Sequence, residues 1–177
     1  LKTNNYLIVD LFSGFGLAFI FISIVMSLLF LSVRIGFISM LPNLIPIIFA
    51  AGYLGFAGIP IRPPIAITFS ICLGIAVDDS LHFLFRFWQE RKNNLNLNKA
   101  ISNTIETTGL AMLTSTIVLV SGFLVITVST FIPTSQFGVI SAITLTVALI
   151  TDITLLPALL YLFPVQFSKD ENNDKMV

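Results

Sequence analysis

Long stretches without any charged residue organise this chain. None occurs from 11 to 33, from 35 to 61 or from 107 to 151. A helix that crosses a bilayer needs about 20 consecutive apolar residues, so the first two stretches fit one span each. The third fits two spans with a proline-containing turn between them. With the apolar stretch after Arg62, the pattern predicts an all-α membrane bundle of five spans, near residues 12–33, 38–57, 65–87, 109–129 and 135–163.

Prolines and one polar segment refine these helices. Pro42 and Pro46 fall in the first turns of the second predicted span, where proline is best tolerated. Pro157 should kink the last span near its end. Residues 88–98 form a polar connection, and Asn98 can cap a short helix after it. We expect that short helix to lie in the cytoplasmic membrane interface.

The composition fits a chain whose solvent is the bilayer. It is 56% hydrophobic and 10% charged, with a mean hydropathy of +0.99, whereas soluble domains carry about a quarter charged residues. The net charge is zero, and no basic run suggests a nucleic-acid partner. The lone Cys72 excludes a disulfide within the chain. These features predict a multi-pass protein of the cell (inner) membrane.

The basic residues predict how the spans are oriented. If the first span runs inward, seven basic residues are cytoplasmic and two are external, so the positive-inside rule selects this orientation. The cytoplasmic set would be Arg34, Arg86, Arg91, Lys92, Lys99, Lys169 and Lys175, and the external pair Lys2 and Arg62. We expect residues 1–11 to be an extracytoplasmic lead-in and residues 164–177 to be a cytoplasmic tail.

Three acidic residues lie inside predicted spans. Asp78 and Asp79 fall in the third span and Asp152 in the fifth. Each costs about 2.5–3.5 kcal/mol at a helix centre, and such residues usually mark a proton or ion path. Counted from the inner helix ends, Asp78 and Asp152 lie at similar depths of roughly 14–15 Å.

Small and polar residues recur at helical spacing on three spans and form a seam on each. The seams are Ser70, Gly74, Asp78 and His82; Thr107, Thr114 and Ser121; and Ser141, Thr144, Ala148 and Asp152. We expect the three seams to pack together and to bury the acids in the interior of the bundle.

Two interpretations of the acids stay open. In the functional one they form a proton relay, because two neighbouring carboxyl groups in a low dielectric can bind and release a proton and so bias a helix arrangement. In the structural one they only hold helices together, and Thr151 and Thr154 could satisfy Asp152 locally. His82 could extend the relay or simply bond Asp78.

Other kinds of site have little support. A metal site would lack ligands, and no nucleophile–base pair suggests an enzyme. We expect no cofactor other than protons as the coupling ion. Arg86, Glu90, Arg91 and Lys92 should form a solvated end of the third span at the lipid headgroups.

Several motifs together resemble one known family. Gly74-Ile-Ala-Val-Asp-Asp-Ser-Leu-His-Phe83, followed by Arg86-Phe, is similar to the fourth-helix signature of the RND superfamily. It is closest to the branch of MMPL-type exporters, which is related to the sterol-sensing domain. The same branch is matched, in the same order, by Leu41-Pro-Asn-Leu-Ile-Pro46, Gly122-Phe-Leu-Val, Gln136-Phe-Gly138 and Leu156-Pro-Ala-Leu-Leu160.

The resemblance implies two six-helix halves, each with a porter domain outside the membrane. This chain would supply five helices of the C-terminal half, so we expect an N-terminal half and porter domains as partners, besides membrane lipids and a hydrophobic substrate, and an oligomeric assembly. It further implies proton coupling at Asp78 and Asp79, where many MMPL-type members have Asp-Tyr.

The function predicted from this resemblance is proton-driven export of lipids or other hydrophobic compounds. Two alternatives remain. A sterol- or lipid-sensing module would need no titratable pair, and an accessory subunit of protein export shares the Gly74–Asp78 motif but not the His82-Phe83 continuation.

Overall fold

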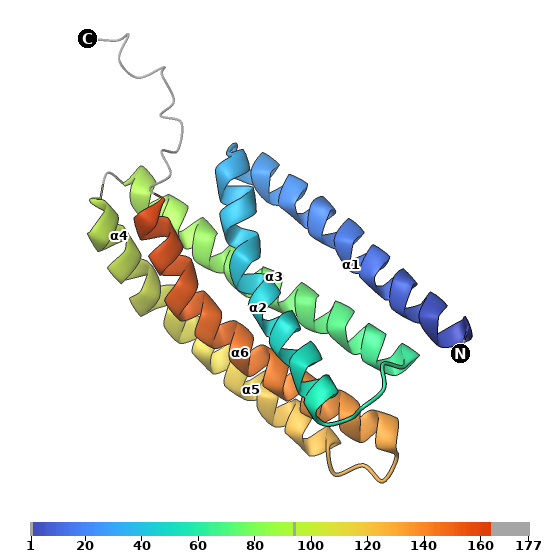
Figure 1. Cartoon of the computed structure of the whole chain (residues 1–177). Coiled ribbons are helices and arrows are strands. Elements are labelled where there is room, and N and C mark those ends of the chain that lie inside the picture. The colour runs from blue at the N-terminus through green and yellow to red at the C-terminus, as the bar shows by residue number, and fades with distance from the viewer. Residues whose placement is uncertain (1, 94, 164–177) are drawn as a thin grey trace, which may run out of the picture.

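The computed structural model describes residues 2–93 and 95–163, and the side chains of residues 13–62, 64–93 and 95–163. Within these ranges the secondary structure is entirely helical (Figure 1). The predicted tail, residues 164–177, lies outside the described residues. The helices are α1 (Lys2–Leu29), α2 (Val33–Phe56), α3 (Pro63–Lys92), α4 (Leu97–Thr104), the π-helical turn η1 (Ile105–Gly109), α5 (Leu110–Ile126) and α6 (Ile132–Leu162).

In the described part of the chain, five apolar helices run alternately up and down the bundle. Four helical stretches are long and apolar enough to cross a membrane, and Ser13–Leu29 of α1 is a shorter apolar helix. Figure 1 places the α1–α2 turn and the end of α6 at one end of the bundle, with the N-terminus at the other. The predicted fold class, a membrane bundle of five helices, is confirmed.

The first two helices differ from the prediction in their limits. Residues 2–11, predicted as a lead-in, belong to α1. The chain turns at Leu31, which has a positive φ of 48°, and Ser32 caps α2 by accepting a hydrogen bond from the backbone nitrogen of Ile35. Because α2 begins at Val33, Pro42 and Pro46 lie in its interior and not in its first turns. Interior proline removes a helix hydrogen bond and bends the axis, and α2 changes direction along its length in Figure 1.

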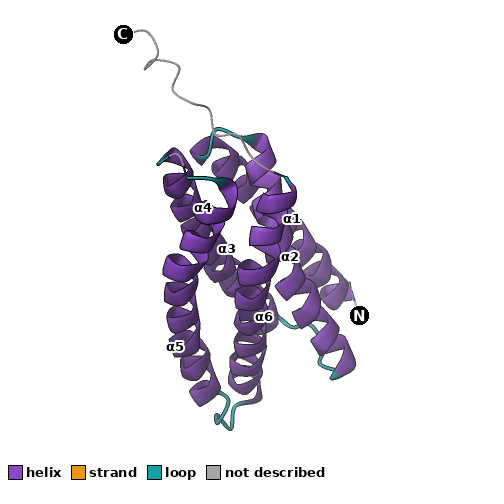
Figure 2. Cartoon of the chain, turned by 90° about the vertical axis from the view of Figure 1, so that its left-hand side faces the viewer, coloured by secondary structure: helices purple, strands orange, loops and turns teal. Residues whose placement is uncertain are grey.

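The prediction of a separate interfacial helix is wrong, because α4 is continuous with the span that follows it. α4, η1 and α5 form one helical stretch from Leu97 to Ile126, which runs down one side of the bundle in Figure 2. No proline separates the polar α4 from the apolar α5, and the helix continues through a π-helical turn at Ile105–Gly109. The polar helix is therefore the first part of the fourth span.

Helix α6 forms the centre of the bundle. It packs against α2, α3 and α5, while α1 packs mainly against α2. The backbones of α5 and α6 approach each other closely at Gly138, where a Cβ would lie 2.6 Å from the carbonyl oxygen of Phe123. A small residue at such a crossing lets two backbones approach in a membrane. Around α6 the core includes Leu84, Phe83, Leu156 and Leu160, none of them exposed.

Candidate functional site

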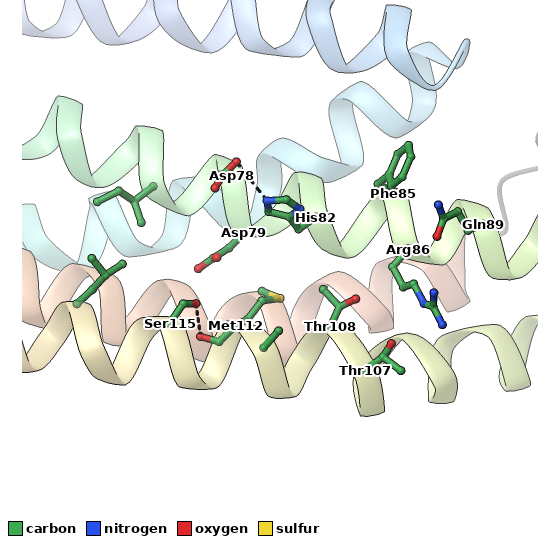
Figure 3. A pocket seen from close by; sticks show the side chains of 13 residues that line it. Asp78, Asp79, His82, Phe85, Arg86, Gln89, Thr107, Thr108, Met112 and Ser115 are labelled. Carbon is green, nitrogen blue, oxygen red and sulfur yellow. Dashed lines mark hydrogen bonds and ion pairs between the residues drawn. The ribbon is translucent and has the colours of Figure 1, made fainter.

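A cleft of about 640 Å³ opens between α3 and the η1–α5 stretch. We call it the α3–α5 cleft (Figure 3). Its apolar wall includes Ile75, Met112 and Leu119. Its polar lining is Asp78, Asp79, His82, Arg86, Gln89, Thr107, Thr108 and Ser115. The third predicted span therefore presents a row of polar side chains to a shared space.

The two adjacent acids of α3 differ in their surroundings. The side chain of Asp78 is 69% exposed and that of His82 is 66% exposed, with His82 Nε2 3.7 Å from Asp78 Oδ1. Asp79 is half-buried, and Figure 3 shows it pointing across the cleft toward α5. The structure thus brings Asp78, Asp79 and His82 together on one side of the described bundle.

The expectation that three seams pack against one another is wrong for two of them. The α6 seam is buried, including Thr144, whose hydroxyl bonds the carbonyl of Ile140. On α3, Ser70 and Gly74 are exposed like Asp78 and His82. The seam of the fourth span is exposed as well, and its hydroxyls bond carbonyls of their own helical stretch: Thr107, Thr114 and Ser121. Helical spacing defines a common face but not what covers it.

Behind the cleft, a hydrogen-bond chain joins three helices. Ser80 Oγ on α3 donates to Asp152 Oδ1 on α6 at 2.7 Å. Asn43 Nδ2 on α2 donates to Ser80 Oγ at 3.1 Å and to the Ser39 carbonyl at 2.8 Å. Asn43 and Asp152 are each 1% exposed and Ser80 is fully buried. We call Asn43, Ser80 and Asp152 the buried triad.

Asp152 therefore accepts its hydrogen bond at Oδ1 from another helix and not from a neighbouring threonine. The hydroxyl of Thr151 bonds the carbonyls of Val147 and Ala148, and that of Thr154 bonds the carbonyl of Ile150. The local interpretation of Asp152 is wrong because serine and threonine hydroxyls in helices readily bond carbonyls one turn back.

The sequence does not single out two residues of the buried triad, Asn43 and Ser80, as site residues. Both are neutral, and each stands in the sequence only as part of a family motif, Ser80 next to Asp79 and Asn43 next to Pro42. An asparagine within an uncharged apolar stretch is itself a signal, because its amide has to find partners in a medium without water.

The end of α3 is less solvated than predicted. Glu90 is 6% exposed. Arg86 Nη2 lies 2.6 Å from Glu90 Oε1, and Asn103 Nδ2 on α4 donates to Glu90 Oε2 at 3.3 Å. The prediction of a wholly solvated end is wrong for Glu90, since α4 folds over this side of α3.

Comparisons with known proteins give a consistent result. A membrane protein of Methanocaldococcus jannaschii is 31% identical over 121 residues, which are 68% of this chain and 31% of the relative. The hopanoid transporter HpnN of Burkholderia multivorans is 30% identical over 116 residues, which are 62% of this chain and 13% of the relative. This chain thus spans less than a third of the length of either relative. No solved structure matches.

The family comparison covers nearly the whole chain. The model of the MMPL family matches residues 9–174. The match includes all of α2 to α6, and with them the α3–α5 cleft and the buried triad. The resemblance found in the sequence motifs is therefore confirmed, and the chain belongs to the MMPL family.

Proposed function

We propose that this chain is the proton-coupling part of a transporter that exports lipids or other hydrophobic compounds. The observation that carries the proposal is the pair of adjacent carboxyl groups, Asp78 and Asp79, on a spanning helix at the wall of a polar cleft. Acids within spans are expensive and mark proton and ion paths. Protons are the proposed coupling ion, and no cofactor is needed.

The packing around α3 supports coupling between protonation and movement. α3 packs on α4 and η1, while the α3–α5 cleft separates its acidic part from α5. A proton bound at Asp79 would remove a negative charge that points toward α5. Such a local change in charge can shift a helix between two positions, and the cleft leaves room for the shift.

The proposed substrate and partners follow from the relatives. The name of one relative states that it transports hopanoids, so a polycyclic membrane lipid is the proposed substrate class. We further propose that a second helical half covers the exposed acids of α3 in the full protein, and that porter domains outside the membrane handle the substrate. The C-terminal end of α6 is proposed to be cytoplasmic, as the basic residues predict.

Transport by the full-length protein in lipid vesicles tests the proposal. The vesicles carry a pH-sensitive dye and a radiolabelled hopanoid, and an imposed pH gradient starts the reaction. Asp78→Asn with Asp79→Asn should abolish both proton flux and hopanoid transfer. Unchanged helix content by circular dichroism and an unchanged elution volume would show that the variant is folded.

Glu106→Gln is the matched control, because Glu106 is an exposed acid of η1 outside the cleft lining. It should retain both activities. Proton-driven transfer that survives the double Asp change would contradict the proposal. Hopanoid binding without transfer, insensitive to pH and to both Asp changes, would instead favour a lipid-sensing module.

A further inference from the structure

We propose that Asn43 and Ser80 are positioning residues that decide on which oxygen Asp152 carries a proton. In this arrangement Oδ1 of Asp152 is held as a hydrogen-bond acceptor, and the proton binds at Oδ2. The proposal deepens the proposed function, because it assigns a defined proton-binding atom to an acid behind the α3–α5 cleft.

The amide of Asn43 is held in one orientation. Its Nδ2 donates to the carbonyl oxygen of Ser39, one turn earlier in α2, at 2.8 Å. If the amide were turned over, Oδ1 would face that carbonyl oxygen, and two acceptors would repel each other. A backbone carbonyl cannot reverse its polarity, so it fixes Nδ2 of Asn43 toward Ser80.

The Ser80 hydroxyl accepts from Asn43 and donates to Asp152. A serine hydroxyl has one proton to donate and accepts on its lone pairs. Because Asn43 Nδ2 donates to Ser80 Oγ at 3.1 Å, the serine proton is free to point at Asp152 Oδ1, 2.7 Å away. The order of donation therefore runs from α2 through α3 to α6 and ends on Asp152.

The two oxygens of Asp152 differ in their hydrogen bonding. Oδ1 accepts from Ser80, whereas Oδ2 has no hydrogen-bond partner in the described part of the chain, although Asp152 is only 1% exposed. A carboxylate in such a site carries an unsatisfied charge, which is costly. A proton on Oδ2 removes this charge without breaking the bond to Ser80.

Few other ionisable groups face this site. Asp79 on α3 is near enough to interact electrostatically with Asp152. The sequence of α5 has no titratable residue, α2 has only Arg34 and Tyr53, toward its two ends, and α4 has only Lys99, which is exposed. Asp79 in the cleft is thus a neighbour whose charge acts on Asp152.

Infrared difference spectroscopy of the full-length protein in lipid, recorded across a pH step, tests the proposal. The carbonyl stretch of protonated Asp152 is identified as the band that Asp152→Asn removes. We expect Ser80→Ala to move this band to higher frequency, because the carbonyl oxygen Oδ1 no longer accepts a hydrogen bond. Asn43→Leu should also move or split it, because the serine hydroxyl can then turn away.

Ser39→Ala is the matched control, since its hydroxyl bonds the Gly36 carbonyl and its own carbonyl remains to hold Asn43. It should leave the band in place. Should Ser80→Ala or Asn43→Leu not fold, the smaller changes Ser80→Cys and Asn43→Ala replace them, with a shift in the same direction. A band that stays fixed in the Asn43 variant, or an Asp152 that never gains a proton, overturns the proposal. Neither result depends on transport at Asp78 and Asp79, so the two proposals fail separately.

Discussion

The hydroxyl of Ser80 donates a 2.7 Å hydrogen bond to Oδ1 of Asp152 across the contact between α3 and α6. Ser80 directly follows Asp79, which lines the α3–α5 cleft. Successive residues of a helix point in different directions, so one turn of α3 presents an acid to the cleft and a hydroxyl to the core. A shift of α3 that alters the cleft therefore also strains the bond to Asp152.

Removing the Ser80 hydroxyl should destabilise the bundle. Ser80→Ala leaves Asp152 without its hydrogen bond in a fully buried site, and an unsatisfied buried group costs about 1–3 kcal/mol. The free energy of unfolding in mixed micelles measures the loss. Ser70→Ala on the same helix is the control, because Ser70 is exposed and bonds only the Ala66 carbonyl. Equal stability of the two variants would show that the Ser80 bond contributes nothing.

Gly138 should tolerate no side chain, whereas Gly122 should. A Cβ at Gly138 would lie 2.6 Å from the Phe123 carbonyl oxygen and 3.1 Å from the Thr127 backbone nitrogen. Because backbone atoms must move to accommodate it, Gly138→Ala should cost about 1–3 kcal/mol. A Cβ at Gly122 would meet nothing within 4 Å, so Gly122→Ala should stabilise α5 by about 0.5–1 kcal/mol. Unfolding in micelles compares the two, and a destabilised Gly122 variant would indicate a helix partner at that position.

The sequence is informative about the spans because charge is excluded from a bilayer. The uncharged stretches from 35 to 61 and from 107 to 151 predict α2, α5 and α6, and the acids of α3 stand out against their apolar neighbours. Helix ends are harder to predict. Val33 is predicted at the end of the first span, but it is the first residue of α2. The turn at Leu31 needs only a few residues, and none of them has to be charged.

The buried triad could not be predicted from the sequence for a different reason. Ser80 and Asn43 are neutral, and similar residues occur on exposed faces of the same helices, as Ser70 does. Spacing alone also made the stripe from Ser70 to His82 look like a packing face. The structure instead packs the opposite side of α3, with Leu73, Phe83 and Phe87, into the core. Which face is covered depends on the neighbouring helices.

The ion pair at the end of α3 should contribute measurably to stability. Glu90 is buried and accepts from Arg86 and Asn103, while the Arg86 side chain is 40% exposed. Arg86→Ala should cost roughly 1.5 kcal/mol, at the lower limit for bonds to charged groups because the arginine is partly solvated. A double-mutant cycle with Glu90→Gln should give a coupling energy above about 0.5 kcal/mol.

Lys92→Ala provides the comparison for that cycle. Lys92 is exposed and lies 5.4 Å from the centre of the Trp88 ring. Its effect should add to that of Glu90→Gln within about 0.5 kcal/mol. A cycle for Arg86 as additive as that for Lys92 would mean that the ion pair is screened by solvent.

The orientation of the bundle can be tested with single cysteines. The chain has one cysteine, Cys72, which is fully buried and should not react. Arg62 lies in the α2–α3 connection and Lys99 in α4, at opposite ends of the bundle, and both are exposed. Because the positive-inside rule places Arg62 outside and Lys99 inside, a membrane-impermeant maleimide added to intact cells should label Arg62→Cys and spare Lys99→Cys. In inside-out vesicles the pattern should reverse. Labelling of Lys99→Cys alone in intact cells would invert the orientation, and Asp152 would then lie toward the external end of its helix.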